Sequence, residues 1–292
     1  MSFLLTAVAA EDDLPLTEAV LDLLRGCLGM KIGGLRWLAE RKAAEFELPG
    51  APTDAQRLAL EAALAPGRVD FHIESTAIPR RKKLLVADMD NTMIVGETLD
   101  ELAEYCGVKD QVAAITERTM RGELDFCQAL RERVAMLAGL PEKALASTLA
   151  EIRPMPGAEI LLRTMRAHGA SCVLVSGGFN CFTGPVSTRL GFHAHHGNIL
   201  EIERGYLTGR VVEPILDYAV KRSLLLRHLA DRGLQASDCL AVGDGANDYA
   251  MLAAAGSGVG YHPKPFLKER VANCILHGDL TVLLYAQGYA DF

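Results

Sequence analysis

Short apolar runs alternate with amphipathic stretches along the chain, and the first 78 residues form one such group. The pattern there predicts strands at 3–9, 35–38, 43–48 and 69–73, and helices at 16–28 and 54–65. This β-α-β-β-α-β order is typical of a small α+β, ferredoxin-like domain. The polar, basic stretch 75–83 contains a proline and predicts a linker, so we expect a domain boundary near residue 78.

Beyond residue 78, apolar runs each end in a cluster of small, polar or acidic residues. Three such runs lie at 84–87, 172–175 and 240–242, and helical periodicity is found at 156–168, 179–190, 218–232 and 247–255. Strands that alternate with helices predict an α/β fold with a doubly wound parallel sheet. Because ligands bind outside the carboxyl ends of such strands, we expect the three polar clusters to converge on one crevice.

Three stretches need a separate interpretation. Residues 98–153 show only helical periodicity, at 99–106, 111–120, 125–138 and 142–151, which predicts a helical insertion after the first core strand, placed to cover the crevice. Residues 197–215 predict a β-hairpin. The histidine-rich segment 193–196 lacks acidic or cysteine companions at ligand spacing, so we expect a polar loop there. Trp37, the single tryptophan, is expected in the core of the first domain.

Composition and charge exclude several classes of protein. A chain of 292 residues that is 50% apolar, with a net charge of −7, is neither disordered nor fibrous, and its length predicts about two domains. Apart from the four basic residues 80–83 of the predicted linker, the sequence has no run of basic residues for a nucleic-acid partner, and it has no apolar stretch long enough to span a membrane. The seven cysteines are not spaced for zinc or redox pairing, so we expect reduced thiols and a cytoplasmic location.

The strongest candidate site follows the first core strand, where Asp88 and Asp90 are separated by a single residue. Two carboxylates that bend toward one centre repel each other unless a cation or a proton lies between them. Asp244 and Asp248 follow another strand and supply further oxygen ligands, a set that suits Mg²⁺ with room for a phosphate. Either segment alone could be an ordinary acidic turn or a helix N-cap, but their joint occurrence at strand ends favours a functional site.

Two other segments supply groups that attract an anion. Ser176 and Gly177 place a hydroxyl and open backbone N–H groups before a predicted helix. Lys221 lies between the second and third clusters, where a phosphate site needs a point positive charge. Taken alone, the first segment could be a simple turn and Lys221 a solvated surface lysine.

In this order, the segments resemble the four motifs of the haloacid dehalogenase (HAD) superfamily and, within it, the phosphoserine phosphatases. The resemblance covers about residues 83–280 and rests on the segments 88–92, 95–101, 126–134, 175–179 and 241–248. It implies a HAD-like, Rossmann-type core with a helical cap. It also implies a Mg²⁺-dependent hydrolase that converts O-phospho-L-serine to L-serine and phosphate through an aspartyl phosphate, in the last step of serine biosynthesis.

The same resemblance implies roles for individual residues. Asp88 would be the nucleophile, and Asp90 the general acid and base. Ser176, Lys221 and the N–H group of Gly177 would bind the phosphoryl oxygens.

The remaining implied roles concern the metal and the rest of the substrate. Mg²⁺ would be held by Asp88, the backbone carbonyl of Asp90 and Asp244, with Asp248 in support. Glu97 would bind the substrate ammonium group and Arg133 its carboxylate. Residues implied to lie near the substrate are Asn247, Met120 and Phe126.

Other interpretations stay open at this point. A related HAD phosphatase or phosphotransferase could act on another small phosphomonoester. An amino-acid-sensing regulator with an idle core would require a lost catalytic residue, yet all the implied catalytic residues are present. The element order of residues 1–78 resembles ACT-type regulatory modules, which predicts either a sensor or a dimerisation domain, and hence a homodimer as one expectation. We expect residues 79–292 to form the phosphatase domain.

Overall fold

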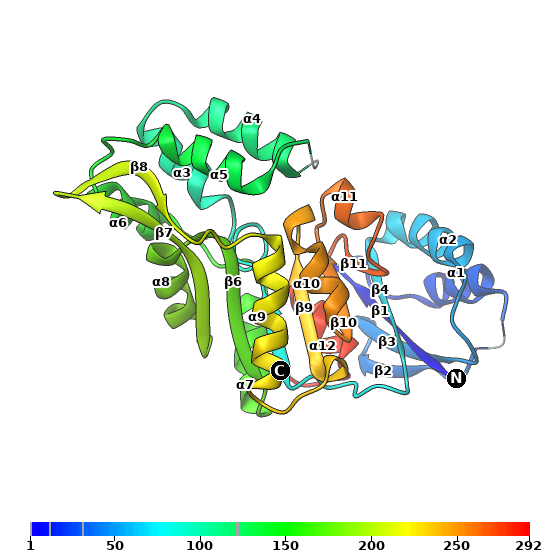
Figure 1. The fold of residues 1–292 in the computed structure, drawn as a ribbon. Helices are drawn as coiled ribbons and strands as arrows, with labels where there is room; N and C mark the ends of the chain where they lie inside the picture. The colour runs from blue at the N-terminus through cyan, green and yellow to red at the C-terminus, as the bar shows by residue number, and fades with distance from the viewer. Residues whose placement is uncertain (1, 12, 31, 121–122) are drawn as a thin grey trace.

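The computed structural model describes residues 2–11, 13–30, 32–120 and 123–292 and contains two β-sheets that each pack against helices (Figure 1). The first sheet and its helices lie to one side of the second sheet. A group of helices lies beyond one end of the second sheet, at the top of Figure 1. No helix among the described residues is long and apolar enough to cross a membrane.

The first sheet is antiparallel, with strand order β2-β3-β1-β4. The predicted β-α-β-β-α-β order is confirmed, and each helix starts at a threonine, Thr17 or Thr53, whose side chain accepts a backbone N–H of the first turn. The elements are β1 (Phe3–Ala9), α1 (Glu18–Leu28), β2 (Arg36–Ala39), β3 (Ala43–Leu48), α2 (Asp54–Leu64), the 3-10 helix η1 (Ala65–Gly67) and β4 (Val69–Ser75).

The second sheet has the strand order β11-β10-β9-β5-β6-β7-β8 and is parallel except for the antiparallel pair β7-β8. The predicted parallel α/β sheet and the predicted hairpin are therefore confirmed. The strands are β5 (Leu84–Ala87), β6 (Ser171–Phe179), β7 (Ala194–Glu203), β8 (Tyr206–Val212), β9 (Cys239–Gly243), β10 (Ser257–Tyr261) and β11 (Asn273–Ile275).

Helices cover both faces of this sheet, because alternate residues of β5 belong to different cores. Leu84 and Val86 pack with α9 and α10, whereas Leu85 and Ala87 pack with α7, α8 and α12. The helices concerned are α7 (Ala158–Ala167), α8 (Asn180–Leu190), α9 (Tyr218–Ala230), α10 (Tyr249–Ala254) and α12 (Val282–Ala286), with the short helices η2 (Ala236–Asp238), η3 (Ala246–Asp248) and α11 (Pro265–Lys268) between strands and helices.

Four helices lie between β5 and α7 in the chain: α3 (Thr98–Tyr105), α4 (Lys109–Met120), α5 (Phe126–Ala135) and α6 (Lys143–Glu151). In Figure 1, α3, α4 and α5 lie together beyond the upper ends of β6 and β9. The β7-β8 hairpin contacts the connection between α5 and α6. The backbone N–H groups of Gly139 and Glu142 donate to the carbonyls of Leu207 and Gly205, at 2.8 Å each.

The first sheet is tied to the C-terminal part of the second. The Asp70 carboxylate accepts three backbone N–H groups, from Leu276, His277 and Gly278, at 2.7, 3.2 and 2.6 Å. The side-chain amide of Asn273 bonds both the N–H and the C=O of Ile73 on β4, at 2.9 and 3.2 Å. Apolar side chains of β1, β2 and β3 share a core with α12. The two sheets therefore form one packed body.

Two expectations from the sequence are wrong. The segment 193–196 is not a loop: β7 begins at Ala194 and pairs in parallel with β6. Its histidines find partners on neighbouring helices, His195 with Thr183 and His196 with His228, at 2.9 Å each, so the strand accommodates them. Trp37 is 36% exposed rather than buried, because it lies on the edge strand β2.

Candidate active site

The three polar clusters converge on one pocket. The pocket lies at the carboxyl ends of β5, β6 and β9 and is also bounded by α5. This convergence was expected because parallel strands end at the same edge of a sheet. The sequence-predicted residues that line the pocket are Asp88, Asp90, Glu97, Phe126, Arg133, Ser176, Gly177, Asp244 and Asn247.

A buried lysine joins two of the aspartates. Lys221 on α9 is fully buried, and its Nζ donates to Asp88 Oδ1 at 2.6 Å and to Asp248 Oδ1 at 2.7 Å. Burial lowers the pKa of Lys221, but the two carboxylates outweigh burial and raise it, so the ammonium group stays charged. Burial and the Asp248 charge raise the pKa of Asp88, while Lys221 opposes them. The lysine thus supplies the charge that allows these carboxylates to lie together.

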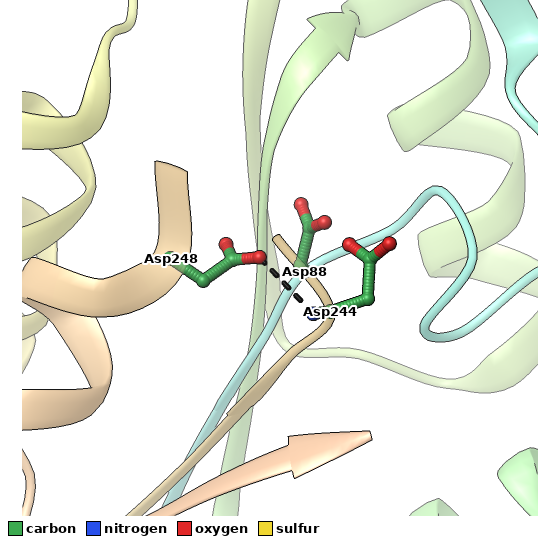
Figure 2. Close-up of side chains that lie close together, drawn as sticks. All are labelled: Asp88, Asp244 and Asp248. Atoms are coloured by element: carbon green, nitrogen blue, oxygen red, sulfur yellow. Dashed lines mark hydrogen bonds between the residues drawn. The ribbon is translucent and has the colours of Figure 1, made fainter. Parts of the chain in front are cut away.

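Asp248 also fixes the loop that carries Asp244. Its Oδ2 accepts the backbone N–H groups of Asp244 and Gly245, at 3.2 and 3.1 Å, and the first of these bonds is drawn in Figure 2. A Cβ atom at position 243 would collide with the Asp248 carboxyl group, which explains the glycine there. The side chains of Asp88 and Asp244 point the same way in Figure 2.

The same carboxylates fit a divalent metal ion. One oxygen from each of Asp88, Asp244 and Asp248 lies within 4.8 Å of the others. Asn247 Oδ1 is buried and has no hydrogen-bond partner among the described residues. Burial raises the pKa of Asp244 to about 7, so its ionised form gains from a nearby cation. Because both oxygens of Asp248 are already bonded, Asp88 and Asp244 are the better direct ligands of an all-oxygen site.

Asp90 is held in a different way. Its Oδ1 accepts the backbone N–H of Thr98 at 2.8 Å, and its Oδ2 accepts the Ser176 hydroxyl at 3.2 Å. The N–H of Gly178 donates to the Ser176 hydroxyl at 2.8 Å. Burial and the neighbouring Glu97 charge raise the pKa of Asp90 to about 6. A carboxyl group with this pKa can exchange protons near neutral pH.

The segment Ser176–Gly178 is more extended than the sequence predicted. Strand β6 continues to Phe179 with a shift of register, rather than ending at 175. A Cβ on Gly177 would lie 2.8 Å from Cζ of Phe126, so this glycine lets α5 approach the sheet. The Gly177 carbonyl accepts the Asn198 side-chain amide at 2.8 Å, which fixes its peptide plane.

Glu97 and Arg133 reach the pocket from the helical segment. Glu97 Oε1 accepts the Asn91 amide at 2.8 Å and the Lys264 ammonium at 3.3 Å. Arg133 is buried, and its guanidinium donates to the Thr116 hydroxyl at 2.9 Å and to the Ala129 carbonyl at 3.2 Å. No described carboxylate forms an ion pair with Arg133, and burial lowers its pKa. Glu97, Asp100 and Asp90 lie near enough to act on its charge, but a buried guanidinium without a direct ion-pair partner still attracts an anion to the pocket.

Sequence reasoning missed several supporting residues, and it named one that cannot be placed. Asn91, Thr98, Asn198 and Lys264 all bond to predicted site residues. Asn91 and Thr98 lie in the segments 88–92 and 95–101 that carry the family resemblance, but no role was assigned to them, and Asn198 and Lys264 lie outside all of those segments. The side chain of Met120 lies outside the described residues.

Comparison with known proteins assigns the chain to a family. The model of haloacid dehalogenase-like hydrolases matches residues 85–253. A phosphoserine phosphatase of Streptomyces coelicolor is 41% identical over 84% of this chain, which spans 60% of that relative's length. One of Albidiferax ferrireducens is 42% identical over 76% of this chain and 96% of its own length.

A solved structure shares the whole architecture. A HAD family hydrolase of Salmonella enterica serovar Typhi matches 98% of both chains with a TM-score of 0.86 and 27% identity. Because the family model covers more than half of the chain and the curated relatives agree, this chain belongs to the haloacid dehalogenase-like hydrolases and, within them, to the phosphoserine phosphatase family.

Proposed function

We propose that this protein is a Mg²⁺-dependent phosphatase that converts O-phospho-L-serine to L-serine and phosphate, the last step of serine biosynthesis. The observation that carries the proposal is that Glu97 and Arg133 line the same pocket as Asp88. A phosphate group, an ammonium group and a carboxylate of one small molecule would each meet a group of complementary charge. Family membership supports the same reaction.

The phosphate end of the pocket suits transfer to an aspartate. The Asp88 carboxylate attacks phosphorus, and the bond from phosphorus to the serine oxygen breaks, which leaves an aspartyl phosphate. Asp90, whose pKa is raised to about 6, gives a proton in its protonated form to the departing serine oxygen. It then takes a proton from water as that water attacks phosphorus, which releases phosphate and restores Asp88.

Three groups position the phosphoryl oxygens in this scheme. Lys221, the Ser176 hydroxyl and the N–H of Gly177 donate to them. Mg²⁺, held by Asp88, Asp244 and the backbone carbonyl of Asp90, would neutralise part of the phosphate charge. Asp248 supports the site by holding Lys221 and the loop of Asp244.

The amino-acid end provides selectivity. The Arg133 guanidinium would bind the α-carboxylate, and Glu97 the α-ammonium group. Phe126 on α5, together with Asn247 and Met120, would line the substrate and exclude water. We assign the insertion 98–153 as a helical cap over the core, because Arg133 and Phe126 come from it.

The remaining domain assignments are part of the same proposal. Residues 1–78 form an ACT-like, ferredoxin-like domain, and residues 79–292 the phosphatase domain. The antiparallel order β2-β3-β1-β4 supports the first assignment. This domain would serve in regulation or dimerisation of a cytoplasmic enzyme whose partner is a small molecule.

The test is phosphate release from a panel of phosphomonoesters, with and without Mg²⁺. We expect the highest kcat/KM for phosphoserine over phosphothreonine, phosphoethanolamine and sugar phosphates, and loss of activity when Mg²⁺ is chelated. Equal rates across the panel, or preference for a sugar phosphate, would contradict the assignment of phosphoserine as the substrate. Full activity after chelation would contradict the requirement for Mg²⁺.

A further inference from the structure

Lys264 takes no part in the scheme above, yet it lies between two of its groups. Its Nζ is 3.1 Å from Asp244 Oδ2 and 3.3 Å from Glu97 Oε1. Asp244 follows β9 in the core, whereas Glu97 is the residue that precedes α3 in the helical segment. One ammonium group therefore connects the proposed metal site to the proposed ammonium site.

The backbone around Lys264 is held firmly. Its N–H donates to the Asp244 carbonyl at 2.8 Å, and the neighbouring His262 N–H donates to the Ile275 carbonyl at 2.8 Å. Pro265 follows at the first position of α11, and Leu267 of that helix is fully buried. The side chain of Lys264 is 32% exposed and lies beside the pocket, against Asp244 and Glu97, which line it.

The partners of Glu97 leave one of its oxygens for substrate. Asn91 and Lys264 both donate to Oε1, and among the described residues no hydrogen bond or ion pair involves Oε2. A glutamate side chain has several rotatable bonds, so its orientation costs conformational entropy unless other groups fix it. Lys264 is a cation that helps to fix it, through the same oxygen to which the Asn91 amide donates.

The partner at Asp244 has the reverse consequence. Asp244 is a proposed Mg²⁺ ligand, and an ammonium group within ion-pair distance of it competes with a metal ion for the same carboxylate. Lys264 should therefore assist substrate binding through Glu97 and oppose metal binding through Asp244.

We propose that Lys264 is a positioning residue that orients Glu97 toward the substrate ammonium group and, through Asp244, weakens the binding of Mg²⁺. The first half rests on the proposed function. The second half depends only on the metal site. A single substitution should therefore move two binding equilibria in opposite directions.

The kinetic test compares Lys264→Met with wild type on phosphoserine and on p-nitrophenyl phosphate. We expect KM for phosphoserine to rise at least fivefold with kcat within twofold, and kcat/KM for p-nitrophenyl phosphate to change less than twofold. Lys264→Arg should restore part of the loss. In a Glu97→Gln background, Lys264→Met should add no further loss, because its target is gone.

The binding test measures Mg²⁺ alone by calorimetry, without substrate. Lys264→Met should bind Mg²⁺ at least twofold more tightly. The matched control is Lys268→Met in α11, the helix that follows Lys264, since Lys268 pairs with Glu61 of the first sheet's helix α2 and its loss should leave both measurements unchanged.

Equal losses on both substrates, or weaker Mg²⁺ binding by Lys264→Met, would mean that Lys264 only supports the fold and would overturn the inference. A wild-type enzyme without preference for phosphoserine would instead refute the proposed function. The Mg²⁺ titration would still decide the second half.

Discussion

The two ends of the pocket are built from different parts of the fold. At the phosphate end, Asp88, Ser176 and Asp244 follow or belong to strands of one parallel sheet, and each is almost fully buried and bonded to other core groups. At the other end, Glu97 is the residue before α3, the first helix of the insertion 98–153, and Arg133 lies on α5 of that insertion. Among the described residues, Arg133 is bonded only within the insertion, to a hydroxyl of α4 and to a carbonyl of its own helix.

This difference separates chemistry from selectivity. Strand ends of one sheet cannot move independently, so groups placed there keep the geometry that phosphoryl transfer requires. Helices joined to the core through loops can change position or sequence without disturbing that geometry. We therefore expect substitutions at the two ends to affect different kinetic quantities.

The largest effect is expected at the sheet. Asp88→Asn should lower turnover by roughly a thousandfold or more and abolish the acid-stable, hydroxylamine-sensitive phosphoenzyme, because an amide is a poor nucleophile. Both phosphoserine and p-nitrophenyl phosphate should be affected. Substantial activity in this variant, with deamidation excluded by mass spectrometry, would remove Asp88 from the mechanism.

Asp90→Asn should have the next largest effect, a loss of roughly a hundredfold in kcat, because proton transfer to the leaving group is lost. Mg²⁺ binding, measured by calorimetry, should be largely kept, since the proposed ligand at this position is a backbone oxygen. Asp244→Ala serves as the comparison and should lose the metal. Equal loss of Mg²⁺ in both variants would contradict the assignment of Asp90.

Substitutions at the amino-acid end of the pocket should lower activity on phosphoserine but not on p-nitrophenyl phosphate. Glu97→Gln and Arg133→Ala should each lower kcat/KM for phosphoserine tenfold or more, on the order of 1.4 kcal/mol. Hydrolysis of p-nitrophenyl phosphate should barely change, because that substrate has neither an ammonium group nor a carboxylate. If both substrates lost equally, these residues would support the cap or the metal site instead of reading the amino acid.

The smallest effect is expected for Thr116, which contacts Arg133. Thr116→Val removes the hydroxyl that accepts a hydrogen bond from the Arg133 guanidinium. This substitution should lower kcat/KM for phosphoserine by about two- to fivefold, as for one lost hydrogen bond. Thr119→Val is the matched control, since this buried hydroxyl on the same helix bonds only the Ile115 carbonyl among the described residues. Identical kinetics for the two variants would show that Arg133 does not depend on Thr116.

Much of the sheet end could be predicted from the sequence because its signals are local. An apolar run followed at once by Asp88 and Asp90, or by Asp244 and Asp248, marks both the strand and the groups at its end. Strand boundaries such as those of β3 and β5 agree with the sequence prediction for the same reason. The short strands β10 and β11 gave too weak a pattern to be predicted.

The supporting contacts could not be predicted because they join distant positions. Lys264 meets Glu97 across 167 residues, and only the fold brings them together. Asn198 reaches Gly177 from the next strand, with no feature of its own segment to indicate it. His195 and His196 led to a wrong prediction for a similar reason. Their polarity indicated a loop, but their partners on α8 and α9 allow a strand there.

The hydrogen bonds of the Asp70 carboxylate to the C-terminal part of the chain bear on whether residues 79–292 can be expressed alone. Every proposed catalytic residue follows residue 83, so a fragment that begins at residue 79 should remain active. Such a fragment would leave the N–H groups of Leu276 and Gly278 without their acceptor. It would also expose the apolar side chains of α12 that pack against the first sheet. A soluble fragment should therefore need polar replacements on α12, and these are a better starting point for engineering than the site itself.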